Sequence, residues 1–167
     1  MNTLVKTIDG LNTWVGRVVG WVMIFIMLLT VYDVIARGLF SAPVLWAFDV
    51  SVQLFALHFM ITAAYALLHN EHVSINIFKA RLGLRTQAAL DILSYLIFFY
   101  PFMIMLLIYG WDFAARSWAS RETSWGVVAL PVYYVKTVIP VTAVLLMLQG
   151  LANIIRLAEI VRKGDAQ

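Results

Sequence analysis

Only one side chain with common metal-binding or catalytic chemistry lies in the middle of a long apolar run of this sequence. His58 stands inside the uncharged stretch Val50–Leu68, where a polar group is expensive and is therefore a functional candidate. A haem held by two histidines needs both at the same depth, and His69 and His72 come only at the end of that stretch. A haem shared by a homodimer, or one bound by His58 and a methionine, stays open. The alternative is that His58 forms a hydrogen bond to a neighbouring helix.

Other features that would indicate an enzyme are missing from the sequence. It contains no cysteine, no phosphate-binding glycine loop, no nucleophile elbow and no HExxH pair. Charged residues near the apolar runs lie at their ends: Asp33, Arg37, Asp49, Asp91 and Lys136. A proton or sodium relay would need acids at mid-depth. We therefore expect no enzymatic activity, no cofactor and no metal in this chain, and no transport by the chain alone.

Four apolar stretches must position these residues. The sequence is 63% hydrophobic and 13% charged, whereas about 25% of residues are charged in soluble domains. The stretches predict spans at about residues 18–40, 48–69, 90–111 and 136–156, and roughly 20 helical residues cross a bilayer. Because lipid offers no hydrogen-bond partners to the backbone, the spans should be helices. We predict an all-α integral membrane protein with four transmembrane helices, forming a single domain over residues 1–167.

The 12 basic residues are distributed unevenly about these spans. The side that holds both termini and the middle loop carries Lys6, Arg17, Lys79, Arg81, Arg85, Arg156, Arg162 and Lys163. The other side carries Arg37, Arg116, Arg121 and Lys136. Since cytoplasmic loops are enriched in lysine and arginine, we predict that the N and C termini are cytoplasmic.

Two segments outside the spans have short amphipathic patterns. Leu4, Val5, Ile8 and Leu11 share one face of a short N-terminal helix, and the middle loop up to Arg85 alternates apolar with basic residues. Apolar groups on one side with basic groups beside them suit the membrane surface. We expect both segments to lie along the inner leaflet as interfacial elements.

The two outer connections differ in length. Phe40–Asp49 is a short turn containing Pro43, so the first two spans should be antiparallel neighbours. Asp112–Lys136 is too long for a simple hairpin and too aromatic for a disordered segment. We expect this loop either to lie on the outer membrane face or to present a docking surface to a partner.

Two runs of residues resemble a known family. The run WAFDVSVQLFALHFMITAAYALLHNEHVSINIF, Trp46–Phe78, resembles the small membrane subunit (DctQ type) of tripartite ATP-independent periplasmic (TRAP) transporters. In that family a Trp followed by acids opens the second helix and a His-Val-x-Val-Asp-like run closes it. The run SWGVVALPVYYVKTVIPVTAVLLMLQGLANIIR, Ser124–Arg156, looks like the end of the branch often associated with keto-acid and other carboxylate substrates.

Two positions depart from the family pattern. Phe48 stands where the family often has its first acid, which leaves only Asp49, and Asn76 replaces the usual Asp after His72. If these acids served ion coupling, their loss would disable the protein. If they serve helix capping and subunit contacts, Asp49 and Asn76 can still do so, since both accept hydrogen bonds. With no acid at mid-depth, a structural role at helix ends and subunit contacts is favoured.

The resemblance implies a transporter subunit in a bacterial or archaeal inner membrane. In such systems a soluble periplasmic protein captures an organic acid, and a large permease subunit moves it with sodium, which that large subunit binds. The small subunit packs in the lipid against the scaffold of the large one and helps dock the periplasmic protein; nucleic acid has no part. The residues expected to make outer-face contacts are Arg37, Trp46, Asp49, Arg116, Trp118, Arg121, Trp125 and Lys136. Those expected to anchor the inner face are His72, Asn76, Lys79, Arg81 and Arg85.

Two alternatives belong to other classes. A membrane-anchor subunit of a respiratory enzyme would hold haem or quinone through His58 and would show a Soret band. A small exporter working as a homodimer would move substrate in liposomes without any other protein, and the lack of charge at mid-depth argues against it.

Overall fold

The computed structural model describes residues 3–69, 82–126 and 128–163 of the chain. Its elements are α1 (Thr3–Phe40), α2 (Ala47–Leu68), α3 (Leu84–Ser94), the π-helix η2 (Tyr95–Phe99), α4 (Tyr100–Ser120) and α5 (Tyr133–Lys163). Helices α3, η2 and α4 follow one another without a break, so Leu84–Ser120 is one long helix. Within the described ranges, four helices are long and apolar enough to cross a membrane. The predicted fold class, an all-helical protein with four membrane-length helices, is confirmed.

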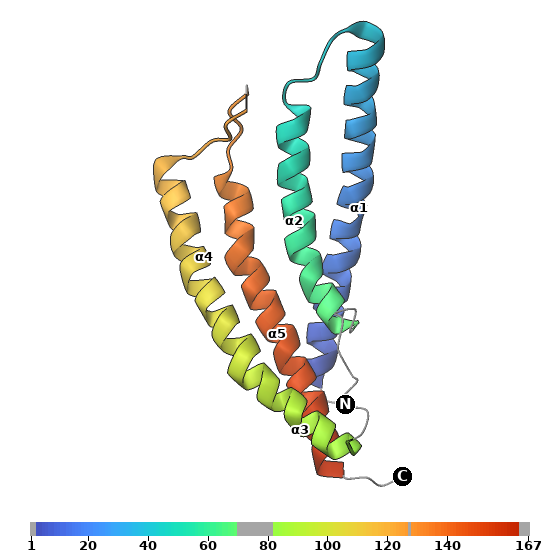
Figure 1. Ribbon diagram of the computed structural model, residues 1–167, viewed down its shortest axis with the longest axis vertical. Coiled ribbons are helices and arrows are strands. Elements are labelled where there is room, and N and C mark those ends of the chain that lie inside the picture. Colours follow the sequence, from blue (N-terminus) through green and yellow to red (C-terminus); the bar gives the residue numbers. More distant parts are fainter. Residues whose placement is uncertain (1–2, 70–81, 127, 164–167) are drawn as a thin grey trace.

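The helices form two antiparallel pairs (Figure 1). Helix α1 packs against α2, α4 packs against α5, and α5 also contacts α2, α3 and α1. Both termini lie at the same end of the bundle (Figure 1), which we name the terminal end. The turn between α1 and α2 and the loop between α4 and α5 lie at the opposite end, named the hairpin end.

The N-terminal segment differs from the sequence-based expectation of a separate interfacial helix. Helix α1 begins at Thr3 and continues without interruption to Phe40. Val5 and Ile8 are buried in a small core with Ala152 of α5, whereas Leu4 and Leu11 are exposed. The apolar face of this segment therefore partly covers another helix, because α5 extends far enough at the terminal end to meet it.

Glycines bring the helices of each pair into close contact. A Cβ atom at Gly16 of α1 would lie 2.6 Å from the Tyr65 ring of α2, and one at Gly150 of α5 would lie 2.6 Å from Phe99. Neither site has room for a methyl group. Small residues at helix contacts allow the close backbone approach that holds helices together in lipid, where the hydrophobic effect offers little.

Candidate interaction sites at the two ends of the bundle

The loop between α4 and α5 is joined to the start of α2 through Asp49. The Ser124 hydroxyl donates to Asp49 Oδ2 at 3.1 Å. The same hydroxyl accepts a 3.1 Å bond from the Leu130 amide, and the Ser124 amide donates to the Leu130 carbonyl at 2.7 Å. Gly126 lies so close that a Cβ atom there would be 1.6 Å from Asp49 Oδ2. Asp49 therefore holds this loop to α2, a role within the chain that the sequence alone did not indicate.

The two sides of this loop also form backbone contacts with each other. Thr123 and Pro131 form an isolated antiparallel bridge, and the Val132 amide donates to the Glu122 carbonyl at 3.1 Å. The loop is thus a short hairpin between Arg121 and Val132, which we name the outer hairpin. The prediction that the connection Asp112–Lys136 is too long for a hairpin was wrong, because α4 continues to Ser120 and α5 begins at Tyr133. It is ordered by its own backbone bonds in addition to the contact with α2.

An ion pair fixes the base of the outer hairpin. Lys136 Nζ lies 2.5 Å from Glu122 Oε2 and 4.1 Å from the centre of the Phe113 ring. The hydrogen bond from Lys136 holds the pKa of the Glu122 carboxyl below its usual value. The Lys136 ammonium group therefore already has partners within the chain, and its expected contact with another protein stays a prediction.

Aromatic residues link α4 to α5 beside this ion pair. The Trp118 indole donates to Thr137 Oγ1 at 2.8 Å, and its ring lies 4.5 Å from that of Tyr133 and 5.4 Å from that of Tyr134. Trp125, by contrast, stands at the tip of the outer hairpin and is fully exposed. Of the three tryptophans expected at the outer face, Trp46 and Trp118 are partly exposed, and only Trp125 leaves its whole ring accessible.

The remaining outer-face candidates divide between the two connections at the hairpin end. Arg37 donates to Asp33 Oδ2 at 2.7 Å, and Asp33 Oδ1 accepts a 2.9 Å bond from the Val44 amide, so this pair orders the turn between α1 and α2. Trp46 is partly exposed just before α2. Arg116 and Arg121 are both exposed at the end of α4. The structure brings Asp49 to the outer hairpin, while Arg37 lies on the other connection.

Most inner-face candidates cannot be placed. His72, Asn76, Lys79 and Arg81 lie outside the described residues. Arg85 is exposed in the first turn of α3, at the terminal end.

A buried polar network at the terminal end was not anticipated from the sequence. Gln149 of α5 is 0% exposed and Asn12 of α1 is 2% exposed. Asn12 Nδ2 donates to Gln149 Oε1 at 2.7 Å, and Gln149 Nε2 donates to Asp9 Oδ1 and Asn153 Oδ1, each at 3.3 Å. Asn153 Nδ2 also donates to the Tyr95 hydroxyl at 3.1 Å, which brings η2 into the network.

Arg156 completes this network with a charge. One of its terminal nitrogens donates to Asn153 Oδ1 at 2.8 Å, and the other forms an ion pair with Asp9 Oδ2. The sequence signal for this network was the pair of amides four residues apart, Gln149 and Asn153, within the predicted fourth membrane span. Polar side chains within membrane helices commonly bond across to another helix.

His58 is bonded within the bundle. Its Nδ1 lies 3.0 Å from the Val19 carbonyl oxygen of α1, and because a carbonyl only accepts, Nδ1 carries the proton. This geometry matches the interpretation of His58 as a histidine bonded to a neighbouring helix. Across residues 3–69, 82–126 and 128–163, no group of three His, Cys, Asp or Glu side chains could hold a metal ion.

Among individually curated proteins, none is similar enough to count as a match. The family model described as "Tripartite ATP-independent periplasmic transporters, DctQ component" matches residues 26–159, from the middle of α1 to the last turns of α5. This match covers most of the chain and does not support a respiratory-enzyme anchor. The chain therefore belongs to the DctQ component family, as a multi-pass membrane protein that is a small permease subunit of a TRAP transporter and not an enzyme.

Proposed function

We propose that this chain is the small permease subunit of a sodium-coupled TRAP transporter for organic acids of the carboxylate or keto-acid class. It packs against the scaffold of a large permease subunit, which binds the sodium, and helps dock the periplasmic substrate-binding protein. The terminal end faces the cytoplasm, in the inner membrane of a bacterium or archaeon. Membership of the DctQ component family is the basis of this proposal.

The outer hairpin supports the docking role. It is held by its own backbone bonds, by Ser124 and Asp49, and by the ion pair of Glu122 with Lys136. A loop that is ordered before binding loses less conformational entropy when a partner arrives. Trp125 at its tip is fully exposed, and tryptophan is among the residues most often found at the energetic centre of interfaces. This exposed ring on an ordered hairpin is the observation that carries the docking proposal.

The positions of the ion pairs favour a structural role for this chain in transport. In the described part of the chain, the ion pairs Asp33–Arg37 and Glu122–Lys136 lie at the hairpin end, and Asp9–Arg156 lies at the terminal end. Transporters that couple substrate movement to an ion place their binding groups near the bilayer midplane. The coupling site is therefore assigned to the large subunit, and this chain positions it.

The docking role is tested by binding of the substrate-loaded periplasmic protein to the assembled transporter in lipid nanodiscs, measured by biolayer interferometry. Trp125→Ala should weaken binding by about 10-fold or more, since truncation of an interface hot spot costs about 2 kcal/mol. Trp14→Ala is the matched control, because Trp14 is also highly exposed but lies in α1 near the terminal end. If the Trp125→Ala and wild-type transporters bind the periplasmic protein with equal affinity, the outer hairpin is not part of the docking surface.

A further inference from the structure

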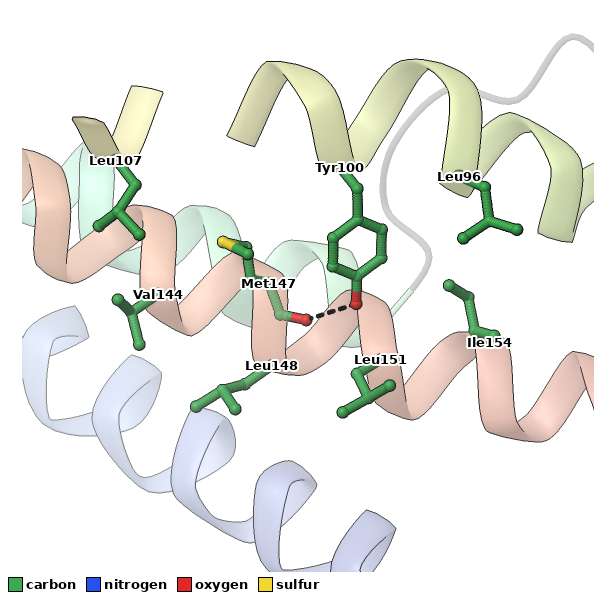
Figure 2. A pocket seen from close by; sticks show the side chains of 8 residues that line it. All are labelled: Leu96, Tyr100, Leu107, Val144, Met147, Leu148, Leu151 and Ile154. Carbon is green, nitrogen blue, oxygen red and sulfur yellow. Dashed lines mark hydrogen bonds between the residues drawn. The ribbon is translucent and has the colours of Figure 1, made fainter. Parts of the chain in front are cut away.

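An apolar groove of about 510 Å³ lies between α5 and the helix formed by η2 and α4 (Figure 2). Figure 2 shows Leu96, Tyr100 and Leu107 extending from η2 and α4 toward α5. The α5 side of the groove is lined by Val144, Met147, Leu148, Leu151 and Ile154. The one polar side chain in the lining is already bonded, because the Tyr100 hydroxyl donates to the Met147 carbonyl at 3.0 Å. The groove therefore accommodates an apolar group and has no free side-chain donor for a polar one.

The length of the groove matches one leaflet of a bilayer. From Val144 to Ile154 it follows α5 for about 15 Å, at a rise of about 1.5 Å per residue. The hydrocarbon core of a bilayer is about 30 Å thick, so each leaflet contributes roughly 15 Å. Since α5 runs toward the terminal end, a bilayer centred on the predicted spans would place the groove in the leaflet at that end.

The lining favours an acyl chain over a helix of another protein. Helices meet in membranes through small residues that let the backbones approach. Within this chain Gly16 and Gly150 mark such contacts, against Tyr65 and Phe99. The groove is lined by Leu, Ile, Val, Met and Tyr, with no Gly, Ala or Ser. These bulky side chains hold another backbone away but leave room for a flexible hydrocarbon chain.

Two arginines lie beyond the groove, on the helix faces that line it. Arg162 comes eleven residues after Leu151, and Arg85 eleven residues before Leu96. Eleven residues are close to three turns, so each arginine lies on nearly the same face as the lining residue. Both are exposed at the terminal end, and α3 packs against α5.

Neither arginine forms an ion pair or hydrogen bond with the described part of the chain. Arg156, in contrast, is paired with Asp9. The helices that carry Arg85 and Arg162, α3 and α5, also carry one acidic residue each near these arginines. Asp91 lines a separate pocket with Leu67 and Phe102, and Glu159 is one turn before Arg162 on α5.

We propose that this groove holds one acyl chain of an anionic phospholipid, whose phosphate is bound by Arg85 and Arg162. Guanidinium groups form charge-assisted, often bidentate bonds to phosphate oxygens. Phosphatidylcholine carries the same phosphate, but its choline cation offsets that charge and is repelled by two arginines, so the site should prefer phosphatidylglycerol to phosphatidylcholine. The bound lipid would fill the groove between α4 and α5 and fasten α3 and the last turns of α5 to the membrane.

Native mass spectrometry of the purified full chain tests the proposal. The chain is exchanged into micelles with equal amounts of phosphatidylglycerol and phosphatidylcholine of the same acyl chains. Wild-type protein should retain one phosphatidylglycerol in preference, and the double variant R85Q/R162Q should lose this preference by roughly fivefold per arginine. The matched control is R116Q/R121Q, which removes two exposed arginines at the hairpin end. Unchanged preference in R85Q/R162Q would overturn the proposal.

A second measurement distinguishes the lipid from a partner helix. The sequence has no cysteine, so Leu148→Cys places a single fluorophore in the groove. In the assembled transporter, phosphatidylglycerol with brominated acyl chains should quench this fluorophore more strongly than brominated phosphatidylcholine. If neither lipid quenches it there, although both reach it in the isolated chain, a protein segment covers the groove and the proposal fails.

Discussion

Asn12 Nδ2 donates a 2.7 Å hydrogen bond to Gln149 Oε1, joining helices whose contacting residues are 137 positions apart in the sequence. Both side chains are buried, and Gln149 also donates to Asp9 and Asn153. Arg156 also forms a hydrogen bond with Asn153 and an ion pair with Asp9. Helix α1 is therefore fixed to α5 by side-chain amide hydrogen bonds and by an ion pair. This network sets the position of the first and last helices at the terminal end.

Replacing Gln149 should therefore destabilise the bundle. Gln149→Leu removes three side-chain hydrogen bonds and leaves the Asn12 amide without its acceptor. Bonds between membrane helices average about 0.6 kcal/mol each, so we expect a loss of about 1 to 2 kcal/mol. Thermal unfolding in mild detergent measures it. Ser94→Ala is the control, because that hydroxyl bonds to the Leu90 carbonyl of its own helix; equal stability of the two variants would contradict the role of the network.

Gly126→Ala should detach the outer hairpin from α2. The added methyl would lie 1.6 Å from Asp49 Oδ2, so the hairpin must move and the Ser124 bond is lost. We expect faster tryptic cleavage after Arg121, which is exposed at the start of the hairpin. Ala129→Gly is the control, since Ala129 has a φ of 48°, which glycine adopts without strain. Cleavage that is no faster in Gly126→Ala than in wild type would show that the contact with Asp49 does not order the hairpin.

The pair of Glu122 and Lys136 predicts an acid-sensitive hairpin. The bond from Lys136 lowers the pKa of Glu122 from its ordinary value of 4.5, so its stabilising effect is present above that value. The effect is lost as the pH falls through the lowered pKa, where the carboxylate gains a proton. Carbon-13 NMR of the Glu122 carboxyl should show this pKa moving upward in Lys136→Met. A Glu122 titration that is the same in wild type and variant would contradict the pairing.

His58 should tolerate an amide in its place. The Asn side-chain nitrogen can stand where Nδ1 donates to the Val19 carbonyl, so His58→Asn should retain stability and uptake. His58→Leu should lose about 1 kcal/mol, the net value of one hydrogen bond. Thermal unfolding and substrate uptake by proteoliposomes measure both. Loss of uptake in stable His58→Asn protein would show that the imidazole has a chemical role.

The four helices were predictable from the sequence, whereas their polar contacts were not. Apolar length alone implies a membrane helix, since lipid leaves the backbone no other structure. The pattern of Val5 and Ile8 is the same whether the apolar face meets lipid or α5, so the sequence does not distinguish the two. Likewise, Ser124 and Asp49 are 75 positions apart, and only the fold brings them together.

The sequence indicated which polar and aromatic residues lie at the hairpin end, but it did not indicate which of them bond within the chain. Trp125 is exposed at the hairpin end, as a docking residue should be. Asp49 and Lys136 form bonds within the chain, because a charged group at a helix end bonds to whichever loop folds over it.

The central claim, that this chain works as a subunit joined to a large permease, is tested most directly by its purification from native membranes in gentle detergent. The bound proteins are identified by mass spectrometry, and uptake is measured with the chain reconstituted alone and with those proteins. The account predicts a multi-span permease in roughly equal amount and no uptake by the chain alone. Purification of the chain without a permease, or uptake by liposomes containing only this chain, would contradict it.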